Sequence, residues 1–392
     1  MNDAIIVSAA RTPIGSLLGA FKDLPAPDLG AEAIKAALAR AGMEPGRIEE
    51  VIMGNVLGAG VGQAPARQAA LKANIPPTVS AVTVNKVCGS GLQAVMFAAQ
   101  AIRVGDASAI VAGGMENMTR APHLLFNLRG GQKLGDSKLI DSMVFDGLTC
   151  AFEGCHMGNH AEHIAAKFGV SREDQDRFAA QSQQRAAKAI ADGVFQEEIT
   201  PVTLTSRKGE TIVDTDEGPR PETTAEALSR LRPVFDSAGS VTAGNASTIS
   251  DGAAAVVVVD ADTANSVDSP LKAKIVSYAT SGTEPKDLFI APVYAIQAAL
   301  KKADLQTSDI ELYEINEAFA SQMVACINEL KLDESQVNVY GGGISLGHPI
   351  GASGARTLVT LLHAMKRNGK KRGVVSLCLG GGNAVAMVIE LQ

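Results

Sequence analysis

Positive charge is scarce in this sequence. Its 35 Lys and Arg residues are outnumbered by 42 Asp and Glu residues, which leaves a formal net charge of −7. This balance argues against a general nucleic-acid-binding protein, although it permits a local basic patch for a phosphorylated ligand. No uninterrupted apolar run reaches the length of a membrane-spanning helix, so we expect no contact with a membrane.

Cysteine is also sparse, and several familiar signals are missing. The five cysteines are widely spread without CxxC spacing, which predicts reduced thiols in a cytoplasmic protein. The first residues lead into an apolar strand without a basic or amphipathic leader, and the last residues are not a peroxisomal address. No GxxxxGKS/T phosphate loop occurs, and residues 58–63 only half match a dinucleotide fingerprint.

What is present is the pattern of a globular α/β protein. Hydrophobic residues make up 46% of the chain and charged residues 20%, and 392 residues allow two or three packed units. In the first half, strand-like and helical runs alternate. We expect strands at residues 5–8, 50–56, 79–84 and 109–112, and helices at residues 29–41 and 92–103.

The second half repeats segments of the first half in the same order. Residues 33–38 return as residues 295–300, which is 262 positions later, and Ser90-Gly91 returns as Ser353-Gly354. Several ordered matches indicate an internal duplication. We therefore predict two similar α/β halves around a pseudo-twofold axis, with the turns at Cys88 and His348 as counterparts that face one interface.

The stretch between the two halves has a different character, with scattered charges and loops rich in Thr, Arg and Glu. We predict an N-terminal half at residues 1–118 that is completed by residues 246–270. An inserted loop domain at residues 119–245 would carry ligand contacts and a helix near residues 172–192, and the C-terminal half would span residues 271–392. The apolar run at residues 251–259 suits a strand buried on both faces.

The first candidate for chemistry is the strand-to-helix turn Cys88-Gly89-Ser90-Gly91. Helix N-termini offer unpaired N–H groups and a partial positive charge, which favour a thiolate over a thiol. The two glycines would let the backbone approach a ligand closely. Alone, the stretch is equally compatible with a buried structural cysteine, so its interpretation depends on partners elsewhere.

Three later stretches supply such partners. His348 lies between a glycine and a proline before a Gly/Ser-rich helix start, where it could deprotonate a thiol or donate to an oxyanion. Cys378 ends a buried strand before three glycines and could shuttle a proton, while the glycine N–H groups line an oxyanion hole. Asn316 follows a strand, starts a helix and could hold a water molecule. The structural alternatives are a turn histidine, a core cysteine and an N-cap asparagine.

A histidine cluster gives a different signal. His156, His160 and His163 have the spacing of one helical face, which suggests a transition-metal site. Two neighbouring glycines weaken such a helix, and no further ligand except Cys155, at a poor angle, completes the set. We therefore expect no metal at these histidines.

Taken together, these stretches resemble the thiolase family from end to end, specifically its short-chain biosynthetic type, the acetyl-CoA C-acetyltransferases. The resemblance is carried by VNKVCGSG at residues 84–91, GGMENM at 113–118, HMG at 156–158, TAGNAS at 242–247, NEAFA at 316–320, GHPIGASGAR at 347–356 and CLGGG at 378–382. It implies a thiolase-like duplicated α/β fold in five layers (α/β/α/β/α) with an inserted loop domain.

The resemblance also implies an activity, the reversible Claisen condensation of two acetyl-CoA molecules to acetoacetyl-CoA and CoA. Cys88 is similar to the nucleophile that carries the acetyl group, and His348 to the residue that activates it. Cys378 is similar to the acid/base that removes a methyl proton from the second acetyl-CoA. Asn316 would hold a water molecule in one oxyanion hole, and the N–H groups of Cys88 and Gly380 would form the second. No metal or other cofactor would be required.

Further residues are assigned by position in the family pattern. Those implied to line the pantetheine and acyl pocket are Leu148, His156, Met157, Ala243, Ser247, Ala318 and Phe319; those near the CoA nucleotide and pantetheine are Arg220, Leu228 and Phe235. Residues 121–142 correspond to the family's oligomerisation loop, which implies a homotetramer built as a dimer of dimers.

Some positions depart from the family pattern. Members mostly read MGxTAEN where this chain has His160 and His163, and they usually have asparagine where it has Tyr340. We expect His160 and Tyr340 to reshape the pocket wall, which leaves the acyl-chain length open. The alternatives are a degradative 3-ketoacyl-CoA thiolase of longer chains, an acyl-carrier-protein ketosynthase, and a Cys-His hydrolase or non-catalytic lipid-binding relative.

Overall fold

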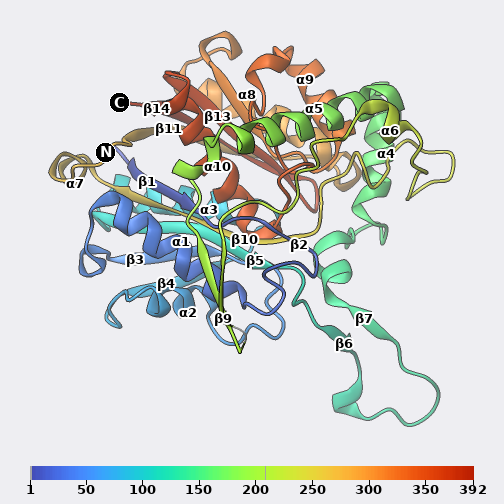
Figure 1. Ribbon diagram of the computed structural model, residues 1–392, viewed down its shortest axis with the longest axis horizontal. Coiled ribbons are helices and arrows are strands. Elements are labelled where there is room, and N and C mark those ends of the chain that lie inside the picture. The colour runs from blue at the N-terminus through green and yellow to red at the C-terminus, as the bar shows by residue number, and fades with distance from the viewer. Residues whose placement is uncertain (1, 208) are drawn as a thin grey trace.

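A mixed sheet of ten strands runs through the molecule (Figure 1). The fold was obtained as a computed structural model, which describes residues 2–207 and 209–392. The sheet order is β12-β13-β14-β11-β1-β10-β5-β3-β4, and β2 pairs with β10. In chain order these strands are β1 (Ile5–Arg11), β2 (Gly15–Ser16), β3 (Glu50–Gly54), β4 (Ser80–Val84), β5 (Ala109–Asn117), β10 (Ser250–Val259), β11 (Ala273–Gly282), β12 (Leu312–Ile315), β13 (Arg372–Leu379) and β14 (Asn383–Leu391).

The sheet consists of two halves with the same strand order. One half reads β1-β10-β5-β3 and the other reads β11-β14-β13-β12. In both halves the first two neighbouring pairs are antiparallel and the last pair is parallel. The halves meet where β1 pairs with β11, at only two residue pairs. This agreement of order and direction confirms the duplication that the sequence predicted.

Helices form three layers around these two half-sheets. The helices of the two halves are α1 (Ala26–Ala41), α2 (Pro65–Lys72), α3 (Ser90–Val104), α8 (Ala291–Ala303), α9 (Ala320–Leu330) and α10 (Ile350–Arg367). Helices α1 and α2 pack outside the first half-sheet, and α8 and α9 belong to the outer core of the second. Helices α3 and α10 pack on each other between the half-sheets, in a third apolar core. The predicted five-layer fold is therefore confirmed.

The inserted segment has its own short elements and packs on both halves. They are β6 (His123–Leu125), β7 (Leu139–Asp141), a π-helical turn (Met143–Leu148), α4 (Met157–Phe168), α5 (Arg172–Ala191), β8 (Val202–Ser206), β9 (Gly209–Val213) and α6 (Ala225–Ser229). Helices α4 and α5 pack against α9, whereas the β6–β7 hairpin projects from the body of the molecule (Figure 1). After the insertion, β10 lies between β1 and β5, and α7 (Ala261–Ser266) leads to the second half.

Most elements lie where the sequence pattern placed them. The helix expected near residues 172–192 is α5, and every residue of β10 is buried, as expected for a strand covered on both faces. One expectation is wrong, because Asn316 does not start a helix. Residues 316–319 lie outside the helix, with Phe319 as the extended N-cap residue of α9, and the helix begins at Ala320. The exact boundaries of the inserted domain stay a prediction.

Helix α3 bears on the expectation that no segment of the chain spans a membrane. The 18-residue window Val87–Val104 has a mean hydropathy of 1.2, so its length and composition alone would allow it to cross a membrane. However, 61% of that window is buried inside the molecule, where α3 packs on α10 and on both half-sheets. Its apolar character is accounted for by its place in the central layer.

The two central helices cross at a point where neither has a side chain. A Cβ atom added at Gly91, in the first turn of α3, would lie 2.7 Å from the backbone nitrogen of Ala355. A Cβ atom added at Gly354 would overlap the backbone nitrogen of Leu92. The Ser-Gly pairs that the sequence identified as counterparts therefore face each other across the pseudo-twofold axis.

We predict that Gly354→Ala destabilises the protein, because the new methyl group meets backbone that cannot rotate away. Overpacking of this kind costs about 1–3 kcal/mol. Gly46→Ala is the matched control, since a Cβ atom at Gly46 would meet nothing within 4 Å. Thermal unfolding midpoints at one protein concentration measure the difference, and equal midpoints for the two variants would contradict a tight helix crossing.

Candidate active site

A cavity of about 640 Å³ opens beside this helix crossing, and it brings together residues from all parts of the chain. Most of the residues singled out in the sequence line it: Cys88, Leu148, His156, Met157, Arg220, Phe235, Ala243, Ser247, Ala318, Phe319, His348, Cys378 and Gly380. The candidate nucleophile, base, second thiol and oxyanion donor thus share one space. Asn316 and Leu228 are not part of its lining.

Cys88 is presented by a strained turn between β4 and α3. Val87 has a φ of 47°, which is a genuine outlier for a β-branched residue and costs on the order of 1–3 kcal/mol. Ser90 holds this turn, because its hydroxyl donates to the Val87 carbonyl at 2.6 Å and accepts from the Lys86 N–H at 2.8 Å. The turn places the thiol in the cavity ahead of the helix, which begins only at Ser90.

The Cys88 thiol is neutral in this structure. Burial raises its pKa to about 12, although the N–H groups of Cys88 itself and of Gly380 act in the opposite direction. Desolvation therefore opposes the effect of the helix N-terminus, which was expected to favour a thiolate. Those two N–H groups, which reach the sulfur, are the same pair that the family resemblance assigned to the second oxyanion hole.

His348 is a neutral imidazole beside this thiol. Burial lowers its pKa to about 3, and the positive charge of Arg356 adds to the effect. Nδ1 lies 2.6 Å from Ser353 Oγ, and the Ser353 hydroxyl donates to the Pro349 carbonyl at 2.8 Å. Because the serine proton is committed, Ser353 accepts from Nδ1–H, which leaves Nε2 unprotonated and able to take up a proton.

Cys378 supplies a second neutral thiol from the opposite half. It lies near the end of β13 and its side chain is 2% exposed. Burial raises its pKa well above the ordinary value, and the neighbouring Cys88 sulfur is the next cause. A thiol with a high pKa is a weak acid, but its thiolate is a strong base. Such a thiolate suits the removal of a weakly acidic C–H proton.

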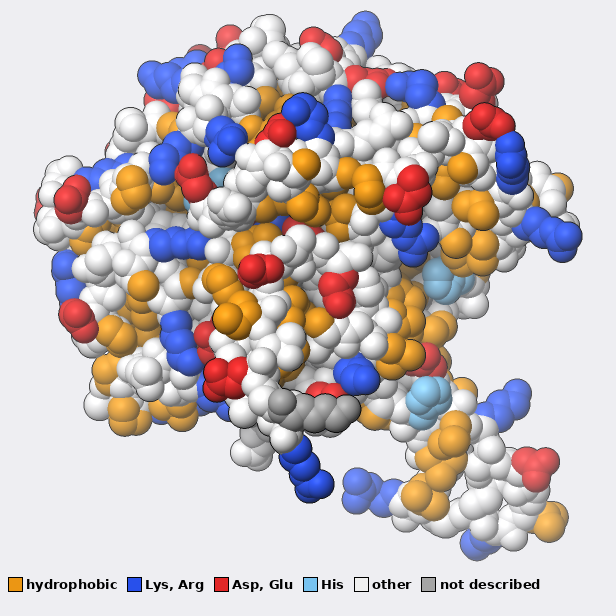
Figure 2. Space-filling view, in the orientation of Figure 1, with side chains coloured by type: hydrophobic (Ala, Val, Ile, Leu, Met, Phe, Trp, Pro, Cys, Tyr) orange, Lys and Arg blue, Asp and Glu red, His pale blue; other side chains and the backbone are white. Residues whose placement is uncertain are grey.

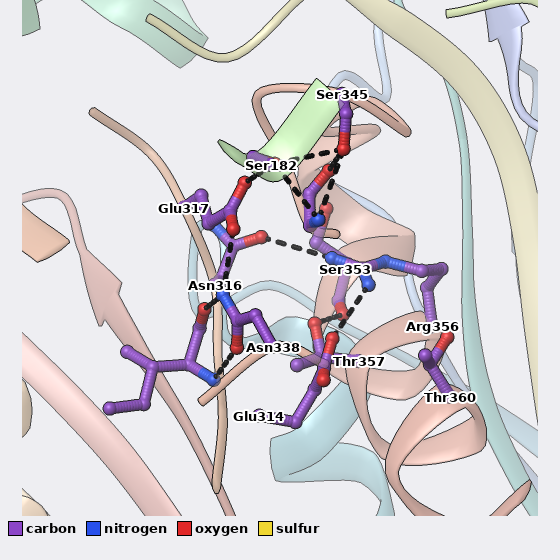
Figure 3. Close-up of polar contacts among 12 residues, drawn as sticks. Ser182, Glu314, Asn316, Glu317, Asn338, Ser345, Ser353, Arg356, Thr357 and Thr360 are labelled. Carbon is purple, nitrogen blue, oxygen red and sulfur yellow. Dashed lines mark hydrogen bonds and ion pairs between the residues drawn. The ribbon is translucent and has the colours of Figure 1, made fainter. Parts of the chain in front are cut away.

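Asn316 is fully buried beside the His348 ring, and its amide oxygen faces Arg356 (Figure 3). Its Nδ2 is 3.4 Å from Nδ1 and 3.5 Å from Nε2 of the imidazole, and its Oδ1 is 3.4 Å from an Arg356 Nη2. Arg356 Nη1 is in turn 3.3 Å from Glu314 Oε1. Burial raises the pKa of Glu314 to about 8, and the Arg356 charge opposes that rise. A buried ion pair thus supports the amide that contacts the base.

The next residue, Glu317, anchors the chain on the other side of Asn316 (Figure 3). Its carboxylate accepts from Ser182 Oγ at 2.6 Å, from Asn338 Nδ2 at 3.0 Å and from the Ile344 N–H at 3.2 Å. Asn338 also pairs with the backbone of Ile315 through both its amide nitrogen and its oxygen. These bonds hold the chain around Glu317 outside the helix, and α9 begins later than expected.

Glu116 has a part that the sequence analysis did not assign, although it lies in the GGMENM stretch. Its carboxylate accepts from Asn55 Nδ2 at 2.7 Å and from the N–H groups of Val56 at 3.0 Å, Leu57 at 3.2 Å and Gly351 at 2.9 Å. Burial raises its pKa to about 7, against these donors. Glu116 therefore ties the first half to the turn that carries His348.

One wall of the cavity is aromatic. His156 Nδ1 accepts from the Gly158 N–H at 3.0 Å and caps α4, and its ring stacks on Phe235 with centroids 4.7 Å apart. Phe319 contacts Phe235 edge-on at 6.3 Å and Phe289 at 5.1 Å. Phe289 lines the cavity but had no motif to mark it in the sequence. These rings leave little width near the reacting groups.

The structure places three residues away from this wall that the sequence analysis expected at the cavity. Leu228 is buried behind it, where a Cβ atom at Gly244 would meet its side chain. His160 and Tyr340 do not line the cavity, so any effect of theirs on its wall, which stays a prediction, would act through other residues. Tyr340 packs edge-on against Phe195 at 6.3 Å instead, and its hydroxyl accepts from Asn368.

Comparison with known proteins decides the family. Models of the thiolase N-terminal domain and the thiolase C-terminal domain match residues 4–262 and 269–391. The chain belongs to the thiolase family. It is 53% identical over 390 residues to an acetyl-CoA acetyltransferase of Pseudomonas aeruginosa, covering 99% of each chain, and 53% identical over 391 residues to one of Cupriavidus necator, covering 100% of each. The crystal structure of the Bacillus anthracis acetyl-CoA acetyltransferase superposes with a TM-score of 0.97 at 41% identity, covering 100% of this chain and 99% of that one.

We predict that alkylation of Cys88 by iodoacetamide accelerates about tenfold per pH unit from pH 6 to pH 9, without a plateau. The thiol has a pKa of about 12 and His348 is neutral above about pH 3, so the thiolate fraction rises with pH throughout this range. Rates followed by peptide mass spectrometry, with Cys88→Ala as the control for site assignment, test this. A pH-independent rate would instead indicate a preformed thiolate–imidazolium pair.

A second prediction concerns the buried ion pair. Arg356→Met leaves the buried Glu314 and Asn316 oxygens without this partner, which should cost about 1–3 kcal/mol of folding free energy. Arg177→Met is the matched control, because Arg177 pairs with Glu334 at 2.8 Å on the surface and is 47% exposed. The control should cost no more than about 1 kcal/mol. Equal losses in urea unfolding would show that the Arg356 pair is not structurally important.

Proposed function

We propose that this protein is an acetyl-CoA C-acetyltransferase that condenses two molecules of acetyl-CoA to acetoacetyl-CoA and CoA, reversibly. The observation that carries the proposal is the convergence of a thiol, a neutral imidazole, a second thiol and backbone N–H donors on one cavity. The names of the relatives, which match over the full chain, support the substrate.

In the first half of the proposed reaction, Cys88 takes up the acetyl group. Its sulfur attacks the thioester carbonyl as His348 Nε2 receives the thiol proton, and the CoA thiolate leaves as CoA-SH with the proton of Cys378, which becomes a thiolate. Neutral partners suit this step, because charge develops only once the carbonyl is in place. A water molecule held by Asn316 would, together with His348, bind the thioester oxygen.

In the second half, Cys378 removes a methyl proton from a second acetyl-CoA. The resulting carbanion attacks the acetyl-Cys88 carbonyl, a C–C bond forms, and the Cys88 sulfur departs as the thiol with the proton that His348 had held. The N–H groups of Cys88 and Gly380 would stabilise the oxyanion, and loss of one such donor typically costs about 10²–10³-fold in rate. No metal or organic cofactor takes part in this route, and CoA is both substrate and product.

The cavity walls support a short acyl group and a CoA carrier. The stacked rings of His156 and Phe235 and the neighbouring Phe319 limit the width beside the reacting groups. Arg220 is exposed at the opening, where its charge suits a phosphate of CoA. A degradative enzyme for longer 3-ketoacyl chains would use the same catalytic residues. Turnover of substrates with different acyl-chain lengths therefore has to decide between the two.

We also propose a cytoplasmic homotetramer, formed as a dimer of dimers. The projecting β6–β7 hairpin exposes apolar side chains that have no core of their own (Figure 2): Leu125, Phe126, Leu128, Leu134 and Leu139. Leu134, at the tip, is 94% exposed. Such an arm fits burial against another copy of the chain. Five unpaired cysteines are in keeping with a reducing compartment.

The test follows loss of acetoacetyl-CoA in the presence of free CoA. Wild-type protein should catalyse thiolysis, and Cys88→Ala should abolish it. Cys378→Ala should lower condensation by about 10²–10⁴-fold while Cys88 still becomes acetylated, as seen by mass spectrometry. Cys326→Ala, a buried cysteine outside the cavity, is the control and should stay active.

Other outcomes would replace the proposal. Thiolysis that survives in Cys88→Ala would remove the nucleophile assignment. Faster turnover of a longer 3-ketoacyl-CoA would favour the degradative enzyme, and acylation of Cys88 only by acyl carrier protein would favour a ketosynthase. Undiminished condensation by Cys378→Ala would remove the acid/base assignment.

A further inference from the structure

A second cluster of reactive side chains lies at the hairpin that precedes α4, outside the cavity. Glu153, Cys155 and His160 each contribute one potential ligand atom, and these three atoms all lie within 4.8 Å of one another. Cys155 Sγ is 3.6 Å from His160 Nε2. None of the three lines the cavity. The proposed acyl transfer therefore gives no reason for them to gather.

The backbone builds this cluster from a tight turn and the first turns of a helix. Thr149 and His156 form an antiparallel bridge, and the Cys150 N–H donates to the Cys155 carbonyl at 2.8 Å. Gly154 closes the turn at a φ of 65°, where a side chain would be strained. The turn thereby brings residues 153 and 155 beside His160, which α4 holds in a buried position.

The spacing of the sulfur and nitrogen atoms fits a tetrahedral metal ion. Zinc lies about 2.3 Å from a cysteine sulfur and about 2.0–2.1 Å from a histidine nitrogen. Two such bonds at the tetrahedral angle separate the ligand atoms by about 3.5 Å. The observed separation of 3.6 Å between Cys155 and His160 matches this value without movement of either side chain.

This cluster is not the histidine set that sequence spacing grouped. His156 caps α4 from outside the helix, and His163 Nε2 lies 2.9 Å from Asp287 Oδ1. Only His160 belongs to both sets, and Cys155, which appeared badly angled on a helix, instead belongs to the hairpin. The atom of His160 that faces Cys155 Sγ is Nε2, the ring nitrogen that an ion between them would bind.

We propose that Glu153, Cys155 and His160 form a site for Zn²⁺, with the fourth position open to water. The donor set of one thiolate, one imidazole and one carboxylate suits this borderline-soft ion. On binding, the Cys155 S–H bond breaks, a sulfur–zinc bond forms and the proton passes to solvent. Glu153 is exposed and Cys155 partly so, which gives the ion access from solvent.

Occupation of this site would cross-link the hairpin to α4. The next two residues after Cys155 are His156 and Met157, which line the catalytic cavity. The ion itself would touch no reacting atom. We therefore expect it to make this wall more ordered and to leave the rate of the chemical step unchanged.

The experiment titrates the full-length protein with Co²⁺, a spectroscopic substitute for zinc. We expect a near-ultraviolet sulfur-to-cobalt charge-transfer band that saturates at a single equivalent and disappears when Zn²⁺ is added. Loss of an outer-shell partner alone weakens metal binding about 10–100-fold, so Cys155→Ser and His160→Gln should each weaken it at least that much. His163→Gln, on the same helix but outside the cluster, should bind like the parent.

Two further variants separate the possible outcomes. Cys88→Ser removes the catalytic thiol and should keep the band; a band lost in this variant but kept in Cys155→Ser would move the metal to the catalytic cavity and overturn the proposal. Absence of a band in the parent protein would overturn it as well. If Cys155→Ser does not fold, His160→Gln and Glu153→Gln carry the test. Failure of the thiolysis assay would leave this result unchanged.

Discussion

The close approach of α3 and α10 is the constraint on which the rest of the structure depends. Gly91 and Gly354 allow backbone to touch backbone at the pseudo-twofold axis, and each glycine stands in the first turns of a helix that follows a candidate catalytic residue. Because the helices meet at these ends, Cys88 and His348 are delivered to the same cavity from the two halves. A bulkier crossing would separate them.

The electrostatics of the cavity follow from its dryness. Burial keeps the Cys88 and Cys378 thiols and the His348 ring uncharged, with charge held one layer deeper by Arg356 and Glu314. A preformed ion pair at the surface of the cavity would be paid for in desolvation before any substrate arrived. With neutral resting groups, the backbone N–H donors are free to stabilise the negative charge that appears on the substrate oxygen during the reaction.

The sequence predicted the fold and most of the site because both depend on local patterns. Strand and helix periodicity, the repeated Ser-Gly pairs and the motif around Cys88 are visible in short windows. What could not be read were effects of packing between distant segments. Burial opposes the expected thiolate preference of Cys88, and the hydrogen bonds of Glu317 hold the chain around it outside α9. Phe289 reaches the cavity only through the fold, without a motif of its own.

The position of β10 has a consequence for how the chain is made. This strand separates β1 from β5, yet it follows them after the whole inserted segment. At about 5–20 residues per second, a ribosome that has produced β1 needs roughly 12–50 seconds to reach β10. During that time the first half-sheet is missing its central member, and its apolar edges are open to other chains. Folding of the first half therefore has to wait until about two thirds of the polypeptide has emerged, and until then its strand edges stay unpaired.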